Sequence, residues 1–266
     1  MWVIPGSEAT SLLWEVGPGV RAGVSTRRGG ASRPPFDTLN WSYAVGDDPQ
    51  AVTENRRRVL AWAHAEPDQL VTAGQVHGAA VAVVGPEEAG RGPVAGVDGL
   101  LTAHPGTVVA VAVADCVPLL LAAPQAGWVG AIHAGWRGTA AKIGPQAVQR
   151  LFEQGVRPDQ LWVGIGPSIG PCCYEVDEPV YTAISQALGS DRPLRPGRPG
   201  HWQLDLWLAN QMALEAVGVP PSHIECLGWC TACRSDWFFS YRRDGPRSGR
   251  MGGWICLTSP TTSTAS

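Results

Sequence analysis

Lysine is almost missing from this chain, and charged residues of both signs are sparse. Only 16% of the 266 residues are charged, the formal net charge is -3, and Lys142 is the only lysine. A nucleic-acid-binding domain usually gathers many basic residues on one face. The composition therefore argues against nucleic acid as a partner.

Long apolar runs and export signals are missing as well. No run approaches the roughly 20 apolar residues that cross a bilayer. Residues 1–5 do not lead into the apolar segment and cleavage site of a signal peptide. We therefore expect a cytoplasmic protein that does not contact a membrane, either a monomer or a homodimer.

Histidine and cysteine are few, so the position of each one carries information. The chain has six histidines, at positions 64, 77, 104, 133, 201 and 223, and seven cysteines, at positions 116, 172, 173, 226, 230, 233 and 256. An odd number of cysteines without an export signal argues against a disulfide framework. Reduced thiols or metal ligands are expected instead.

Apolar residues make up 44% of the chain, which is enough to bury a sizeable core. We find no internal repeat and no long linker, and we expect one catalytic domain over residues 1–266. An exposed loop is expected at residues 192–200, and a frayed end is expected after Leu257.

Short apolar runs predict more strands than helices. Strands are expected at residues 20–26, 70–76, 79–84, 108–114, 118–122, 128–133, 161–165, 224–227, 238–241 and 254–257. Helices are expected at residues 49–63, over a periodic stretch from about 140 to 151 that Pro145 could kink, and at residues 206–217. Strands and helices do not alternate one for one, so we predict an α+β fold with a mixed sheet rather than a doubly wound parallel sheet.

Three of the scarce ligand residues follow apolar runs at predicted strand ends. They are His77 in Gln75-Val-His-Gly78, Cys116 in Ala114-Asp-Cys-Val-Pro118, and His133 in Ile132-His-Ala-Gly135. Imidazole and thiolate together suit zinc or copper, and three protein ligands leave the open position of a catalytic zinc site. Taken singly, each residue is equally compatible with a structural histidine or a small core cysteine.

The motifs around this trio carry a resemblance that covers nearly the whole chain. In order they include Gln75-Val-His-Gly78, Asp98-Gly-Leu-Leu-Thr102, Ala114-Asp-Cys-Val-Pro118, His133-Ala-Gly-Trp-Arg-Gly138, the run from Gly166 to Val176, and Phe238-Phe-Ser-Tyr-Arg-Arg-Asp244. This series resembles the YfiH-type family, whose members are called laccase-domain, polyphenol oxidase or purine nucleoside phosphorylase proteins.

The resemblance implies a fold, a metal site and an activity. The fold is a mixed-sheet α/β/β/α sandwich, and the metal ligands fall on His77, Cys116 and His133. The activity is phosphorolysis of adenosine, inosine and methylthioadenosine, with adenosine deamination beside it. Older labels imply oxidation of phenols through copper, and another implies editing of peptidoglycan precursors.

Two alternatives to a zinc phosphorylase remain open. A multicopper oxidase needs an imidazole-rich cluster of three coppers, and six histidines are too few and too scattered for it. A metal-free cysteine hydrolase, with Cys116 as nucleophile and His133 as base, would suit an amidase that acts on cell-wall peptides.

Phosphate and nucleoside, the small-molecule partners of a phosphorylase, need their own ligands. Arginine binds phosphate oxygens with two N–H groups at once. We expect Arg27, Arg137 and Arg242 as phosphate ligands and Asn40 as a ribose or base contact. Alternatively, Arg137 and Arg242 have a purely structural role and form salt bridges with acids such as Asp115 or Asp244.

Two cysteine motifs remain outside this scheme. Cys230-Thr-Ala-Cys233 has the spacing of a zinc half-site or a redox pair, but the chain has no second motif of this kind. We therefore expect a structural or substrate-side role for it. The adjacent pair Cys172-Cys173 is expected to be a packed turn element.

Overall fold

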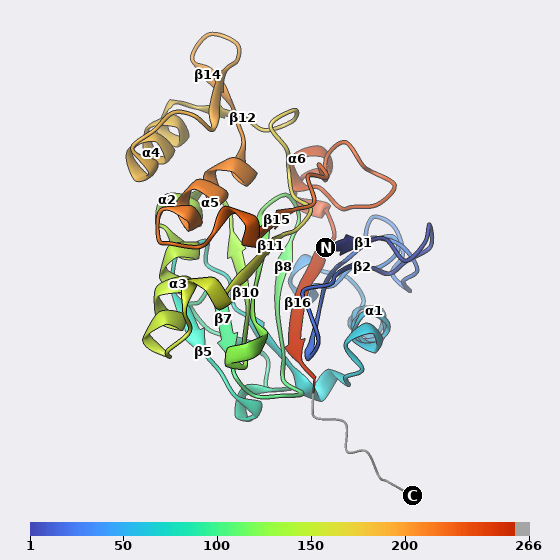
Figure 1. Cartoon of the computed structure of the whole chain (residues 1–266). Coiled ribbons are helices and arrows are strands. Elements are labelled where there is room, and N and C mark those ends of the chain that lie inside the picture. The colour runs from blue at the N-terminus through green and yellow to red at the C-terminus, as the bar shows by residue number, and fades with distance from the viewer. Residues whose placement is uncertain (259–266) are drawn as a thin grey trace, which may run out of the picture.

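The computed structural model describes residues 1–258, and two large mixed β-sheets form the centre of the molecule (Figure 1). The first has the order β1 (Trp2–Val3), β2 (Ser11–Trp14), β3 (Val20–Ser25), β16 (Met251–Leu257), β8 (Val108–Val113), β4 (Leu70–Ala73), β6 (Pro93–Val94). The second has the order β15 (Ile224–Cys226), β11 (Trp162–Ile165), β9 (Val117–Ala123), β10 (Trp128–Ala134), β7 (Gly99–Thr102), β5 (Val81–Val83).

Six helices lie within residues 1–258, and four of them flank the two large sheets. They are α1 (Pro49–Leu60), α2 (Trp136–Ala140), α3 (Ile143–Glu153), α4 (Glu178–Leu188), α5 (Leu206–Glu215) and α6 (Tyr241–Asp244). In Figure 1, α1 lies beside the first sheet, and α2, α3 and α5 lie beside the second. No helix within residues 1–258 is long and apolar enough to cross a membrane.

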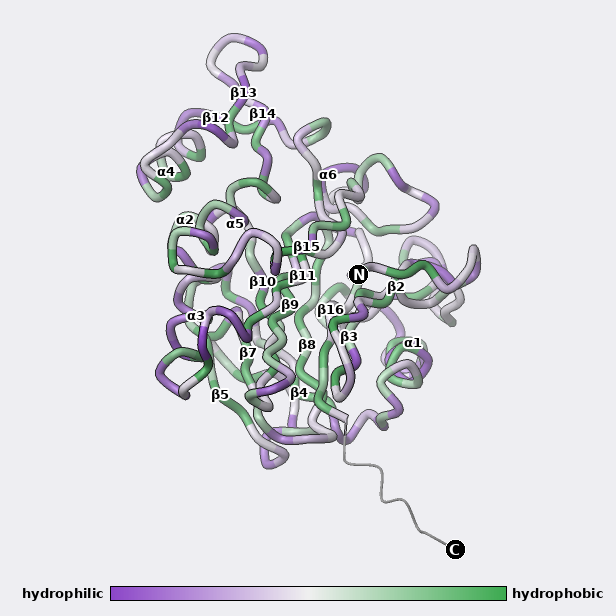
Figure 2. Tube along the Cα trace, viewed as in Figure 1, coloured by the Kyte–Doolittle hydropathy of each residue, from purple (hydrophilic) through white to green (hydrophobic). Residues whose placement is uncertain are grey.

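Three buried apolar clusters lie between the layers, and the central strands of the two large sheets are mostly green, and so apolar, in Figure 2. One cluster joins the two sheets through residues such as Val109, Leu120 and Ile255. A second packs the second sheet against α3 and α5, and a third packs α1 against the first sheet. The layers therefore follow the order α/β/β/α, which confirms the predicted fold class.

Glycine is required where β16 of the first sheet packs against β9 of the second. A Cβ atom on Gly253 of β16 would lie 2.8 Å from the Pro118 side chain of β9. On the other face of β16, a Cβ atom on Gly252 would lie 2.5 Å from the ring of Trp41. The absence of a side chain on Gly253 lets the two sheets pack closely next to the start of β9, which Cys116 precedes.

The strand predictions are largely confirmed, with one exception. Residues 238–241 were expected to form a strand, but residues 238–240 form none. The Ser240 side chain instead accepts a hydrogen bond from the Arg243 amide and begins α6. Apolar residues beside a serine are compatible both with a strand and with the start of a helix. Here Ser240 is the N-cap of a helix.

The helix expected from about 140 to 151 is two helices, α2 and α3. The break falls at Lys142, which has a left-handed φ of 59°, and Pro145 lies in the first turn of α3 without kinking it. The helices predicted at 49–63 and 206–217 correspond to α1 and α5, and Asp48 and Asp205 cap them as expected.

A small sheet, helix α4 and the strands β1, β2, β6 and β7 were not anticipated from the sequence. Strands β12 (Glu175–Asp177), β14 (His201–Leu204) and β13 (Leu194–Pro196) form a third sheet beside α4. The loop expected at residues 192–200 therefore contains a strand. The end predicted to fray after Leu257 lies, beyond Thr258, outside the described residues.

Candidate metal centre

The structure brings His77, Cys116 and His133 together. One ligand atom from each lies within 4.8 Å of the other two, and the two imidazole rings meet edge to face with their centroids 4.8 Å apart. His77 is exposed, Cys116 is half-buried, and His133 is only 3% exposed. The group is therefore anchored in the protein on one side and open to solvent on the other.

Strand pairing places Cys116 beside His133. In the antiparallel pair of β9 and β10, Val117 is opposite Ala134 and Pro118 is opposite His133. Cys116 directly precedes β9 after a tight turn in which Asp115 has a φ of 90°. The two ligands thus leave neighbouring strands at the same rim of the second sheet.

His77 reaches the same point from a loop rather than from a strand. It lies between β4 and β5 with a left-handed φ of 58°. Residues other than glycine adopt this conformation infrequently, so surrounding contacts must hold it.

The carboxylate of Asp98 supplies those contacts. It is completely buried and accepts hydrogen bonds from the backbone N–H groups of Val76, His77 and Gly78, at 3.1, 2.9 and 2.8 Å. Its Oδ1 also lies 2.8 Å from Nδ1 of His133. Burial raises the pKa of Asp98, but the bonds from His133, Gly78 and Val76 outweigh burial and lower that pKa to about 2.

Asp98 also determines which nitrogen of His133 is available. Because Nδ1 donates to the carboxylate, Nε2 is the nitrogen left for the centre. An outer carboxylate that orients a histidine in this way is the usual partner of a metal-ligating imidazole. Sequence reasoning quoted Asp98 only as part of a motif and gave it no role.

The thiol of Cys116 is set to be a thiolate. Burial raises its pKa, but the charge of His133 and hydrogen bonds with His133 and His77 bring the pKa down to about 6. Burial in turn lowers the pKa of His133, and the thiolate of Cys116 and the bond to Asp98 raise it above the ordinary histidine value. A thiolate is the form of cysteine that binds a metal or attacks a substrate.

Gly135 leaves the space that the ligands occupy. A Cβ atom at this position would lie 2.9 Å from Sγ of Cys116 and 3.5 Å from Nδ1 of His77. The φ of Gly135 is -73°, which any residue adopts, so the requirement for glycine is one of space alone. This residue was also missed, although it belongs to the quoted His133–Gly138 motif.

Arg137, Arg242 and Cys116 all lie within electrostatic range of Tyr174. The Arg242 guanidinium lies 4.9 Å from the ring centroid of Tyr174 and donates to the Glu175 carbonyl. Burial and the Cys116 charge raise the pKa of Tyr174, while Arg242 and Arg137 oppose that rise, which places both guanidiniums within electrostatic reach. Neither forms a salt bridge within residues 1–258.

The acids expected to pair with these arginines bind elsewhere. The carboxylate of Asp115 accepts from Oγ1 of Thr231 and from the backbone amide of Arg242, each at 2.6 Å. Asp244 pairs with Arg243 at 2.7 Å. Asp115 therefore fixes the backbone that carries Arg242 and leaves its guanidinium unneutralised.

The polar atoms of Arg27 and Asn40 form hydrogen bonds with other parts of the protein. Arg27 donates to the carbonyls of Asp37 and Ser235 and stacks on Phe239. Asn40 is fully buried and bonds to Ser42 and Asp47, and its oxygen accepts from the Arg250 amide. Their contact with substrate stays a prediction.

Replacing Asp98 with asparagine should weaken metal binding. The amide keeps the shape of the carboxylate but turns an N–H group toward backbone donors and loses the negative charge that His133 uses. Loss of such an outer partner typically costs about 10- to 100-fold in metal affinity. Zinc competition with a chromophoric chelator measures this. The exposed pair Arg157–Asp159 offers Asp159→Asn as the control, and equal affinity in Asp98→Asn and wild type would contradict the assignment.

Gly135→Ala tests the space around Cys116. The added methyl group must displace the thiolate, and overpacking of about 1–3 kcal/mol corresponds to roughly a 10- to 100-fold weaker zinc affinity. Gly144→Ala is the matched control, because its methyl group would meet only the ends of Leu119 and Leu214, at 3.2 and 3.4 Å. A Gly135→Ala protein that binds zinc as tightly as the control would refute the packing argument.

Comparison with known proteins places the chain in a family. Residues 21–258 match the family model described as "Multi-copper polyphenol oxidoreductase laccase". A protein of Geobacillus stearothermophilus named purine nucleoside phosphorylase YlmD is 43% identical over 247 residues, covering 89% of this chain and 90% of its own length. A protein named adenosine deaminase, from an unknown prokaryotic organism, is 35% identical over 240 residues, covering 87% and 92%.

The solved structures agree with the sequence matches. The crystal structure of YlmD from Geobacillus stearothermophilus superposes with a TM-score of 0.91 at 41% identity, covering 94% of this chain and 97% of that one. The resemblance seen in the motifs is thus confirmed, and the chain belongs to the laccase-like family that includes YlmD and YfiH.

Proposed function

We propose that this protein is a zinc-dependent purine nucleoside phosphorylase with adenosine deaminase side activity. Its substrates would be inosine, adenosine, methylthioadenosine and phosphate, and its products the free base and the sugar 1-phosphate. The observation that carries the proposal is the convergence of two imidazoles and a thiolate, with two arginines near Tyr174 that form no salt bridge within residues 1–258. Two relatives are named purine nucleoside phosphorylase and adenosine deaminase, and these names support purine nucleosides as the substrate class.

The donor set fits zinc. His77, Cys116 and His133 would hold the ion, and three protein ligands are the number typical of catalytic zinc sites. When bound, zinc supplies Lewis-acid charge that stabilises negative charge developing on a substrate atom. Asp98 keeps His133 in the tautomer that this role requires.

In phosphorolysis, a phosphate oxygen attacks the anomeric carbon and the bond from that carbon to the base nitrogen breaks. The bonding electrons leave with the base, so the site must hold an anion close to the sugar and tolerate charge on the departing base. Arg137 and Arg242 offer forked donors for the phosphate. Arg242 is the better fixed, because Tyr174, Glu175 and the Asp115–amide bond hold it in place.

We propose that Arg27 and Asn40 also support the walls of the site. Asn40 ties its own loop to the residue that precedes β16, and Arg27 crosses to the segment that contains Ser235. Arg27 therefore stabilises the segment that leads to α6, the helix that carries Arg242, and Asn40 stabilises the segment that leads to β16.

A multicopper oxidase is not supported by the ligands that this chain provides. All six histidines lie within residues 1–258, where the side-chain groups that could hold a metal are the trio and a cluster of four cysteines. His223 stacks on Trp162 with ring centroids 4.0 Å apart, and its Nδ1 lies 3.1 Å from the Leu161 carbonyl. A cluster of three coppers lacks the imidazoles it requires.

A cysteine hydrolase is the second candidate, and one observation favours it. Asp98, His133 and Cys116 form a carboxylate–imidazole–thiolate series of the kind that activates a cysteine nucleophile. This series also suits a thiolate metal ligand, so the two hypotheses differ in whether metal is needed.

Product analysis tests the phosphorylase. Incubation with inosine, adenosine or methylthioadenosine and phosphate should release free base and the sugar 1-phosphate. Chelation should abolish this and zinc should restore it. Arg242→Lys should raise the KM for phosphate about tenfold, since a lysine loses the fork, while Arg157→Lys should not. Base release that is absent with every nucleoside, or that is unchanged in His77→Ala, would overturn the proposal.

The reactivity of Cys116 separates the two candidates. In protein stripped of metal, its alkylation by iodoacetamide should keep half its maximal rate near pH 6, because the pKa of Cys116 is about 6 and the thiolate persists below neutrality. Zinc should protect the thiol. Cys116→Ser is the control and should lose this phase, since burial raises the pKa of a thiol such as Cys256 to about 11. Metal-free protein that retains full hydrolytic activity until alkylated would favour the hydrolase.

A further inference from the structure

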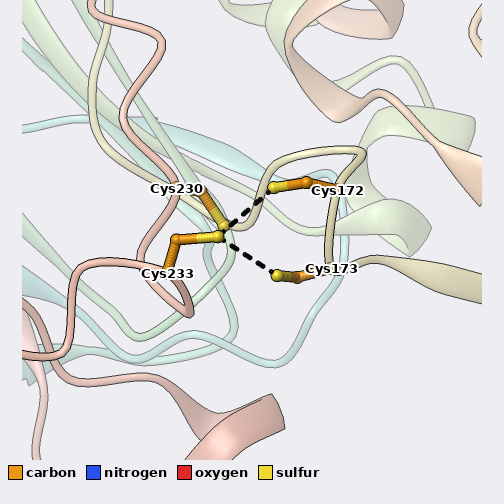
Figure 3. Close-up of side chains that lie close together, drawn as sticks. All are labelled: Cys172, Cys173, Cys230 and Cys233. Carbon is orange, nitrogen blue, oxygen red and sulfur yellow. Dashed lines mark hydrogen bonds between the residues drawn. The ribbon is translucent and has the colours of Figure 1, made fainter.

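Four cysteines from two distant segments meet beside the site (Figure 3). Cys172 and Cys173 lie in the loop between β11 and β12, and Cys230 and Cys233 follow β15. All four Sγ atoms lie within 4.8 Å of one another. The sequence contains no second CxxC motif to complete a zinc site with Cys230 and Cys233. In the structure, the neighbouring residues Cys172 and Cys173 provide the other two sulfurs.

We propose that these four cysteines form a second metal site, a tetrahedral zinc site with thiolate ligands only. Zn–S bonds are about 2.3 Å long, so the sulfurs of such a site lie about 3.8 Å apart along each edge. Sγ of Cys233 lies 3.5 Å from that of Cys172 and 3.4 Å from that of Cys173. These separations are close to that edge and far from the roughly 2.05 Å of a disulfide.

The surroundings of the sulfurs suit thiolate ligands. The backbone amide of Gly170 donates to Sγ of Cys230 at 3.2 Å, a contact that stabilises negative charge on sulfur. Burial raises the pKa of Cys230, yet the amides of Gly170 and Cys233 hold it below the ordinary thiol value. Burial and the contact with Cys233 raise the pKa of Cys173 to about 11. Because neighbouring thiolates repel one another, the four thiols are not all ionised in the absence of a cation. A bound divalent ion would favour the thiolate form, and the thiol protons would be released to solvent.

The site would be structural rather than catalytic. Four protein ligands close the tetrahedron and leave no position for substrate, in contrast to the three ligands of the first centre. Cys172 and Cys233 are exposed, so an ion has access from solvent.

The two segments that this zinc would join also build the wall of the first centre. Cys173 is followed by Tyr174, against which Arg242 packs. Between Cys230 and Cys233 lies Thr231, whose hydroxyl donates to Asp115, the residue before Cys116. A zinc ion would therefore fix the arginine side and the thiolate side of the wall with one set of bonds.

Metal content per chain in separate variants tests the second site independently of the first. His77→Ala/Cys116→Ala removes the first centre and should retain one zinc per chain. Cys173→Ser/Cys233→Ser should lose one zinc relative to wild type and keep the ion of the first centre. Cys226→Ser, which removes an exposed cysteine outside the cluster, is the control and should match wild type. If the first centre held no ion, wild type would hold one zinc and the cluster variant none, while His77→Ala/Cys116→Ala would still hold one.

Cobalt substitution provides a second measurement if the double cysteine variant fails to fold. Cobalt-loaded His77→Ala/Cys116→Ala protein should show the intense thiolate-to-metal charge-transfer absorption of a four-sulfur site, and Cys172→Ser alone should weaken it. The proposal is overturned if the His77→Ala/Cys116→Ala protein, purified with reductant, holds no zinc and gains no such absorption. It is equally overturned if intact mass shows these cysteines joined as disulfides in freshly purified protein.

Discussion

The buried carboxylate of Asp98 is the contact on which the first centre depends. A fully buried charge is costly unless hydrogen-bonded donors surround it, and here three consecutive backbone amides and one imidazole do so. The three amide bonds hold the loop around His77 in its left-handed conformation, and the bond with His133 fixes the tautomer of that imidazole. One side chain thus joins a loop on one sheet rim to a strand of the second sheet.

Much of the fold could be predicted because its strands are continuous apolar runs, which the α/β/β/α layers bury on both faces. The metal trio could be proposed because each ligand lies in a distinctive motif. The role of Asp98 could not, since it depends on contacts with residues 20 to 35 positions away in the chain. Gly135 was missed for a similar reason, because its lack of a side chain matters only where β9 and β10 bring Cys116 beside it.

The errors have equally local causes. Ser240 caps a short helix in a segment whose apolar residues also favour a strand, and Lys142 ends a helix where Pro145 was the expected cause. The four-cysteine cluster lay hidden because its halves are 57 residues apart, as the positions 173 and 230 show, and only one half has the familiar CxxC spacing. A single sequence does not show that two different motifs, distant in the chain, lie side by side in the fold.

The uneven burial of the first centre has a kinetic consequence. His133 is nearly inaccessible and held by Asp98, whereas His77 faces solvent on a loop. We expect an ion to exchange by detachment of one outward side chain, without unfolding of the sheet. A ligand set of imidazole and thiolate prefers copper to zinc by the Irving–Williams order. The metal that such a protein carries would then follow the supply in its surroundings, and a single chain would acquire a different reactivity with each ion.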